Sequence, residues 1–114
     1  MEINKGIKNN LKQLVIELIN GNFSKLVSTG QAGRLTEEEI RTALYECNGE
    51  LTPPPEEAYD TIEIYSVENG TNPAWAVDFD LWINNERSDL TLSCTVIQDD
   101  KGEFQISIDD LHVL

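Results

Sequence analysis

The spacing of apolar residues divides the chain into two halves with different periods. In the first half these residues recur every three or four positions, which is the period of a helix with one buried face. They are Ile3, Ile7, Leu11, Leu14, Val15, Leu18 and Ile19. The stripe predicts an amphipathic helix over 3–20 that ends at Gly21. Asn22 is expected to cap a short second helix that turns Phe23, Leu26 and Val27 inward.

A further helix is predicted from its start signals. Thr36 can accept a hydrogen bond from the backbone of Glu39, and the Glu39 side chain can return one to Thr36, which makes a capping box. Glu37 and Glu38 add negative charge where the helix dipole favours it. Gly49 marks the expected end. The predicted inner face consists of Ile40, Ala43, Leu44 and Cys47.

In the second half, apolar and polar residues alternate, which is typical of strands with one buried face. The apolar series are Trp75, Val77, Phe79, Leu81 and Ile83, then Leu90, Leu92, Cys94 and Val96, then Phe104, Ile106 and Ile108. A less regular run over 60–68 predicts an edge strand. Asn69-Gly70 and 100–102 are typical turn sequences. Together these runs predict a four-stranded antiparallel meander.

Placing apolar residues opposite apolar residues predicts the register, and a slip of one residue would turn a whole strand outward. The predicted pairs are Ile83 with Leu90, Leu81 with Leu92, Phe79 with Cys94, Val77 with Val96, Asp99 with Glu103, Val96 with Ile106, and Cys94 with Ile108. The polar face would then hold one row of Asp80, Ser93 and Asp109, a second row of Asp78, Thr95 and Ser107, and Trp82 and Thr91 at one end. After Ile108 the phase changes, which predicts a bulge or the end of the strand.

At 114 residues the chain is expected to form one domain. It would consist of a helical half over 1–50, a Pro-rich connector over 51–58 that favours extended backbone, and an antiparallel sheet over 59–114. Helices followed by a meander predict an α+β fold, in which two to three N-terminal helices pack on one face of the four-stranded sheet and leave the polar face uncovered.

Charge is distributed unevenly along the chain. Residues 35–114 carry 19 acidic and three basic residues, and the whole chain has a formal charge of −13. Such a field repels nucleic acid and anionic membranes and attracts basic proteins or cations. No apolar run approaches the roughly 20 residues of a membrane span. The N-terminus lacks the pattern of a secretory signal, so the cytoplasm is the expected location.

Three carboxylates on the polar face, those of Asp78, Asp80 and Asp109, could form an acid/base pair or hold a cation. A solvated sheet face explains them equally simply and is the favoured interpretation. Trp82 is different, because a large aromatic residue on a polar face either lines a pocket or serves as a contact anchor. Glu37 and Glu38 could face a basic partner or merely support the helix start.

The remaining candidates for chemistry are few. His112 is the only histidine, so a common zinc site is not expected. Cys47 and Cys94 have no catalytic signature and are expected to be reduced. With no set of nucleophile, base and orienting group, we expect no catalytic residue, no metal and no cofactor.

The runs Glu86-Arg87-Ser88-Asp89-Leu90-Thr91-Leu92 and Ile108-Asp109-Asp110-Leu111-His112-Val113-Leu114 resemble a small family of bacterial domains. Small acidic proteins of this kind resemble the immunity proteins of polymorphic toxin and contact-dependent growth inhibition systems. The order of helices and a curved meander is also similar to cystatin and NTF2-like folds. The resemblance covers about a quarter of the chain, and it implies no catalytic residue.

Two functions follow as hypotheses. The favoured one is an immunity protein, or antitoxin, that binds and neutralises a basic toxin domain, with nucleases as the favoured class because they need positive surfaces. The alternative is an NTF2-like pocket protein that binds or hydrolyses a small molecule. The candidate toxin-binding residues are Glu37, Glu38, Asp78, Asp80, Asp99 and Asp100, with Trp82 as the anchor.

Overall fold

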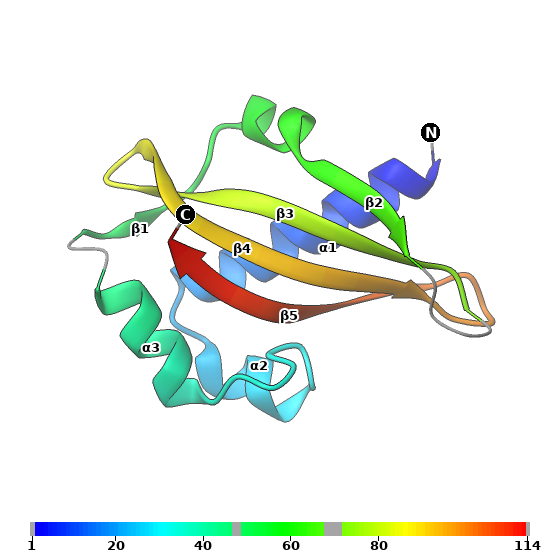
Figure 1. Ribbon diagram of the computed structural model, residues 1–114, viewed down its shortest axis with the longest axis horizontal. Helices are drawn as coiled ribbons and strands as arrows, with labels where there is room; N and C mark the ends of the chain where they lie inside the picture. Colours follow the sequence, from blue (N-terminus) through cyan, green and yellow to red (C-terminus); the bar gives the residue numbers. More distant parts are fainter. Residues whose placement is uncertain (1, 47–48, 68–71, 114) are drawn as a thin grey trace.

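The computed structural model describes residues 2–46, 49–67 and 72–113 and has an α+β fold (Figure 1). Three helices cover one face of an open antiparallel sheet, and a short 3₁₀ helix lies between its first two strands. The elements are α1 (Glu2–Ile19), α2 (Phe23–Ser28), α3 (Glu37–Tyr45), β1 (Leu51–Thr52), η1 (Glu56–Thr61), β2 (Glu63–Val67), β3 (Ala74–Ile83), β4 (Glu86–Gln98) and β5 (Phe104–Val113). Cys47 and the Asn69-Gly70 turn lie outside the described residues. No helix in the described ranges is long and apolar enough to cross a membrane.

The strands are ordered β1-β3-β4-β5, and β2 also pairs with β3. Two strands therefore share one edge of β3: β1 pairs with Trp82 and Ile83, and β2 pairs with Ala74–Asp78. The gap between them is filled from η1. There the ring of Tyr59 stacks on that of Phe79, with centroids 5.0 Å apart. The predicted meander is confirmed, and β1 is an addition to it.

The core lies between α1 and the apolar face of the sheet, as the alternation predicts. One buried cluster joins Ile7, Leu11, Leu14 and Leu18 of the helix to Phe79, Leu81, Leu92 and Ile106 of the strands. Gly6 allows the close approach of helix and sheet, since a Cβ there would lie 2.3 Å from the Phe104 ring. The polar face is turned away from the three helices, which confirms the predicted orientation of the sheet.

The predicted register between β3 and β4 is wrong by two residues along Ala74–Asp80 and by four at the turn, where Ile83 lies opposite Glu86 rather than Leu90. Phe79 lies opposite Leu92 rather than Cys94, and Val77 lies opposite Cys94. A shift of two preserves the face on which each side chain lies, so apolar residues still meet apolar residues. The apolar pattern therefore determines the face of the sheet but leaves registers that differ by two residues equally acceptable.

A tight turn explains the shift. Asn84 and Asn85 both have positive φ, 52° and 66°, and they connect the paired residues Ile83 and Glu86. Two residues at positive φ form a type I′ hairpin turn, and asparagine tolerates that backbone conformation. The strand β4 therefore starts at Glu86, four residues before the predicted start at Leu90.

The extra residues of β4 are absorbed by an irregularity opposite Leu81, between the pairs Asp80/Thr91 and Trp82/Arg87. Ser88 stabilises it, because its hydroxyl donates to the Leu81 carbonyl at 2.6 Å and accepts from the backbone of Leu90.

The register between β4 and β5 is confirmed. Val96 lies opposite Ile106, Cys94 lies opposite Ile108, and the Asp99 backbone donates to the Glu103 carbonyl at 2.8 Å. The predicted change of phase after Ile108 is a bulge: the pairing shifts between Ser93 and Cys94, and β5 continues to Val113.

The capping predictions have different outcomes. Thr36 and Glu39 form the predicted capping box at the start of α3. Asn22 makes no side-chain cap for α2, and its amide nitrogen donates to the Glu17 carboxylate at 3.3 Å. Phe23 and Leu26 of α2 are buried as predicted, but the prediction that Val27 points inward is wrong, since that side chain is 43% exposed.

Within the Pro-rich connector predicted over 51–58, β1 and the start of η1 are regular structure. Two ion pairs fasten η1 to α1, one between Lys8 and Asp60 and one between Lys12 and Glu56. This attachment helps to position η1, whose residues Glu57 and Ala58 line the candidate site.

Candidate functional site

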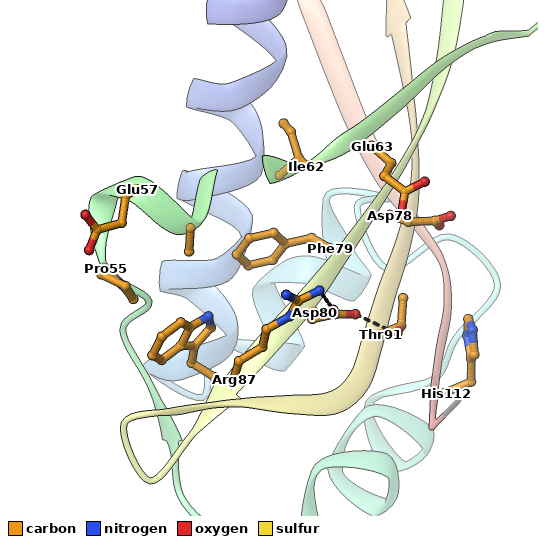
Figure 2. A pocket seen from close by; sticks show the side chains of 12 residues that line it. Pro55, Glu57, Ile62, Glu63, Asp78, Phe79, Asp80, Arg87, Thr91 and His112 are labelled. Atoms are coloured by element: carbon orange, nitrogen blue, oxygen red, sulfur yellow. Dashed lines mark hydrogen bonds and ion pairs between the residues drawn. The ribbon is translucent and has the colours of Figure 1, made fainter. Parts of the chain in front are cut away.

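A groove of about 480 Å³ lies where η1 meets the polar face of the sheet (Figure 2). Its lining comes from η1 and its flanks, from β2 and β3, and from β4 and β5. The lining residues are Pro55, Glu57, Ala58, Ile62, Glu63, Asp78, Phe79, Asp80, Trp82, Arg87, Thr91 and His112. Four carboxylates and a single arginine line the groove, so it is predominantly acidic. We refer to it below as the Trp82 groove.

Asp80 lies at the centre of a hydrogen-bonded network in this groove (Figure 2). The Arg87 side chain donates to one carboxylate oxygen through Nε at 2.9 Å and Nη2 at 2.5 Å. The Thr91 hydroxyl donates to the other oxygen at 3.0 Å. Because both oxygens have partners, Asp80 is held in place and is poorly suited to act as a general base.

Asp78 and Glu63 lie opposite one another on β3 and β2. The Ser93 hydroxyl donates to Asp78 Oδ1 at 2.8 Å. The Tyr65 hydroxyl donates to Glu63, and this hydrogen bond is the main cause that raises the pKa of Tyr65. No lysine or arginine forms an ion pair with Asp78 or Glu63 among the residues described. Like charges directly opposite one another are unfavourable in a sheet, so this pair leaves the groove with unbalanced negative charge.

Trp82 lies beside Arg87 in the register and is half-buried. Its neighbours along the polar side of β3 are the two aspartates. An indole in this position offers apolar area and an N–H donor at the mouth of the groove, which suits a contact anchor.

His112 enters the groove from β5, opposite Thr91. Its Nδ1 lies 3.1 Å from Asp110 Oδ2, yet in the described part of the chain this nitrogen is buried and makes no hydrogen bond. The groove therefore combines the carboxylates of its lining with one histidine.

The predicted rows of the polar face must be corrected. The prediction of Asp80 with Ser93 and Asp109 in one row is wrong, because Asp80 lies in a row with Thr91 and His112. The other row joins Asp78, Ser93 and Asp110. Asp109 is displaced by the bulge and accepts a hydrogen bond from Thr95 at 2.6 Å.

The structure brings together Asp78, Asp80 and Trp82 but not the other candidates. Glu37 and Glu38 belong to α3, where Glu37 pairs with Arg41 at 2.7 Å. Asp99 and Asp100 lie at the turn between β4 and β5, at the opposite end of the sheet from the turn beside Trp82 (Figure 1). There Asp99 Oδ1 accepts from the backbones of Lys101 and Glu103, both at 2.9 Å, which is a structural role in the turn. Asp100 accepts from Asn72 at 3.3 Å.

Of the residues that line the groove, only Asp78, Asp80 and Trp82 were among the candidate toxin-binding residues; Glu63, Arg87 and His112 are among those that were not. Arg87 was placed in a loop because the two-residue turn was not recognised. The sequence does contain a signal for this turn, because two consecutive asparagines, Asn84-Asn85, between an apolar and a charged residue suit a two-residue hairpin turn. His112 is the only histidine and carries no sequence signal of a site, and the bulge in β5 brings it opposite Thr91.

The groups with strongly shifted pKa values lie away from an accessible reaction site. Burial, followed by the charges of Asp109 and Asp78, raises the pKa of the Cys94 thiol well above its ordinary value, so it is a poor nucleophile. Burial, followed by the charge of Glu56, raises the pKa of Tyr59 from 10.0 to about 12. Within the described ranges no three His, Cys, Asp or Glu side chains are arranged to hold a metal ion. The arrangement suits binding through charge and an aromatic contact.

Residues 15–114 match the model of a protein family described as "Domain of unknown function (DUF7668)". No curated protein and no solved structure matches the chain. The family match begins within α1 and includes every strand and every residue that lines the Trp82 groove. The chain therefore belongs to the DUF7668 family.

Proposed function

We propose that this protein is an immunity protein, an antitoxin that binds and neutralises a basic toxin domain in the bacterial cytoplasm. A nuclease domain is the favoured target, because proteins that grip nucleic acid need positive surfaces. The observation that carries the proposal is the location of the charges. Most basic side chains form ion pairs with acidic residues of the same chain, whereas four carboxylates line the Trp82 groove.

The basic side chains mostly pair with acidic residues of the same chain. Five of the eight lysines and arginines form such pairs, namely Lys8 with Asp60, Lys12 with Glu56, Lys25 with Glu17, Arg41 with Glu37, and Arg87 with Asp80. Each pair removes one cation from the side chains available to a partner. The formal charge of −13 is therefore expressed at the surface mainly through carboxylates. Such a surface steers basic proteins toward itself and can raise association rates by about 10 to 1,000-fold at low salt.

The Trp82 groove offers a specific contact site for the partner, whereas the overall charge provides only long-range attraction. Trp82 is a half-buried part of its lining, and Asp78 and the exposed Glu63 line it without forming ion pairs among the described residues. Interfaces commonly depend on one aromatic anchor surrounded by polar residues. The groove is therefore the centre of the proposed interface, and residues of the open sheet face form its rim.

The test is protection of cells. The protein encoded by the neighbouring gene, which the proposal expects to carry a basic toxin domain, is expressed with wild-type protein, with Trp82→Ala, or with the control Trp75→Phe. Trp75 packs against Phe104 on the inner face, with ring centroids 5.8 Å apart, so the control changes a tryptophan away from the groove. Wild type and Trp75→Phe are expected to protect, and Trp82→Ala is expected to protect poorly. Failure of the wild-type protein to bind or protect against such a domain would reject the proposal.

A second candidate function rests on the volume of the groove. About 480 Å³ lies within the usual range of roughly 300–1,000 Å³ for small-molecule pockets. In that case the protein is a pocket protein of NTF2-like type. Native mass spectrometry of purified protein distinguishes the two functions: a small molecule that co-purifies with wild type and is lost in Trp82→Ala supports the pocket. A protein without bound ligand that captures the toxin domain supports the immunity function.

A further inference from the structure

The outer edges of the sheet differ in how they are protected. At the β5 edge, the Ile108 backbone donates to the Gln31 carbonyl at 2.7 Å, and the bulge at Asp109 interrupts the strand. The β1 edge is only two residues long. Proteins commonly protect sheet edges by such means, since an open edge can pair with another strand.

The edge strand β2 lacks these protections. Its five residues pair with β3 without any shift of register, and the segment contains neither proline nor lysine. Two of its large side chains are exposed, Tyr65 by 49% and Val67 by 39%. Both point to the polar face of the sheet, where they lie beside Ala76 and Ala74. This strand therefore presents an unprotected edge with an apolar ridge along one side.

The two sides of this edge carry opposite charges. On the polar face of the sheet the strand presents Glu63, which lies opposite Asp78. On the other face, the first turns of α1 emerge beyond β2 (Figure 1), and Lys5, Asn9 and Ile64 are among the residues that line a shared hollow there. Lys5 forms no ion pair within the part of the chain that the structure describes. A strand added beside β2 would thus meet a carboxylate on one side and an ammonium group on the other.

We propose that the edge of β2 binds an extended segment of a partner protein, which adds to the sheet as an antiparallel strand. The segment would place a basic side chain beside Glu63, apolar side chains beside Tyr65 and Val67, and an acidic side chain toward Lys5. Its backbone would supply the hydrogen bonds, and the alternating side chains would supply selectivity. This surface borders the Trp82 groove at Glu63 but extends away from it.

A second copy of this chain fits the edge poorly. Its β2 would present Ile64 or Ser66 toward Lys5, where a carboxylate is needed, and Val67, Tyr65 or Glu63 toward Glu63, where a cation is needed. Each copy also carries a formal charge of −13, so the two would repel. Charge complementarity therefore favours a different protein as the source of the strand.

The experiment uses two short acetylated peptides of identical composition. In the matched peptide, consecutive Val, Thr, Val, Glu and Lys residues lie opposite Val67, Ser66, Tyr65, Ile64 and Glu63, in that order. In the exchanged peptide the Glu and Lys residues trade places. Binding to the full chain is followed by NMR shifts and by hydrogen exchange of the β2 amides, at peptide concentrations up to the millimolar range. We expect the matched peptide to shift and protect residues 63–67 and to bind at least several-fold more tightly than the exchanged one.

A charge-reversed protein supplies the internal control. The double variant Lys5→Glu/Glu63→Lys changes two exposed side chains, and we expect it to prefer the exchanged peptide. Gln105→Lys, an exposed change on β5, should leave the original preference intact. Absence of shifts in β2, equal binding of the two peptides, or an unchanged preference in the double variant would overturn the proposal. Self-association of the protein that is abolished by Val67→Lys would overturn it in favour of a second copy. Glu63 also lines the Trp82 groove, but the peptide outcomes are read at the β2 amides without any toxin domain, so failure of this proposal and failure of toxin binding can be told apart.

Discussion

At the scale of single residues, the two tryptophans of the sheet show how position determines role. Trp75 and Trp82 are both half-buried members of β3, but they lie on opposite faces. Trp75 packs against Phe104 beside the core, whereas Trp82 lies at the mouth of the acidic groove. Substitution should therefore affect stability at one position and binding at the other.

The first prediction compares Trp75→Ala with Trp82→Ala. Loss of Trp75 leaves Phe104 without its ring partner and should lower the free energy of unfolding by about 3 kcal/mol. Loss of Trp82 should change stability much less and weaken toxin binding by about 2 kcal/mol or more. Urea denaturation and titration calorimetry measure the two quantities. Equal loss of stability in both variants would show that Trp82 is a core residue and not an anchor.

A second prediction concerns Tyr59 and pH. Its pKa is raised from 10.0 to about 12, first by burial and then by Glu56, so the folded state binds the phenolic proton more tightly than the unfolded state does. This contribution to stability is fully present below pH 10 and is lost as the pH rises toward 12. Denaturation curves across that window should show a smaller loss of stability in Tyr59→Phe than in wild type. An identical pH dependence of the two proteins would contradict the assignment.

At the scale of elements, the hairpin between β3 and β4 determines which residues share the groove. It places Arg87 beside Trp82, and it moves Thr91 next to Asp80. The turn depends on positive φ at Asn84 and Asn85. Asn84 is also used through its side chain, which accepts a hydrogen bond from the Glu50 backbone at 3.1 Å. The backbone N–H of Asn85 donates to the Thr52 hydroxyl. A substitution of the Asn85 side chain therefore leaves that hydrogen bond in place, whereas a substitution of Asn84 removes one.

The third prediction follows from that difference. Asn85→Gly relieves the cost of positive φ at 66° and should raise the free energy of unfolding by a few tenths to about 1 kcal/mol. Asn85→Val places a β-branched residue in the same conformation and should lower it by about 1–2 kcal/mol. Urea denaturation of both variants beside wild type gives the comparison. Stabilisation by valine would refute the type I′ turn and, with it, the placement of Arg87.

The same hairpin shows what the sequence could and could not predict. Alternation identified the apolar faces of β3, β4 and β5, because burial acts on every second residue. The turn at Asp99 was predictable, since its residues specify one geometry and its register is correct. The Asn84-Asn85 turn competed with a longer loop that matched the apolar residues equally well, and the predicted register is wrong by four residues at the turn and by two beyond the irregularity at Leu81. The groove depends on that register, on the bulge at Asp109 and on η1, so its composition could not be read from periodicity alone.

At the scale of the whole molecule, the division between a basic first third and an acidic remainder of the sequence is not preserved as two separate surfaces in the fold. The basic first third does not form a separate positive surface, because Lys8 and Lys12 pair with acidic residues of η1 and Lys25 pairs with Glu17. These pairs lie at the surface and contribute only modestly to stability. The ion pairs matter more for recognition. Because these lysines are paired, carboxylates dominate the electrostatic field that a partner protein meets.

The central claim is that an acidic surface centred on the Trp82 groove steers a basic toxin domain into contact. Two double variants separate the effect of location from that of net charge. Glu63→Gln/Asp78→Asn removes two carboxylates at the groove, and Glu38→Gln/Glu46→Gln removes two exposed carboxylates of the α3 region. Because both lose the same charge, any difference between them reports where the toxin approaches.

The most direct measurement is the stopped-flow association rate of these proteins with the cognate toxin domain across a salt series. We expect the rate for wild type to fall steeply with ionic strength, because the Debye length shrinks from about 10 Å at 0.1 M to about 3 Å at 1 M. At low salt, the groove variant should associate several-fold more slowly than the α3 variant, and the difference should vanish at high salt. An association rate that is insensitive to salt, or equal for the two variants at low salt, would contradict the account.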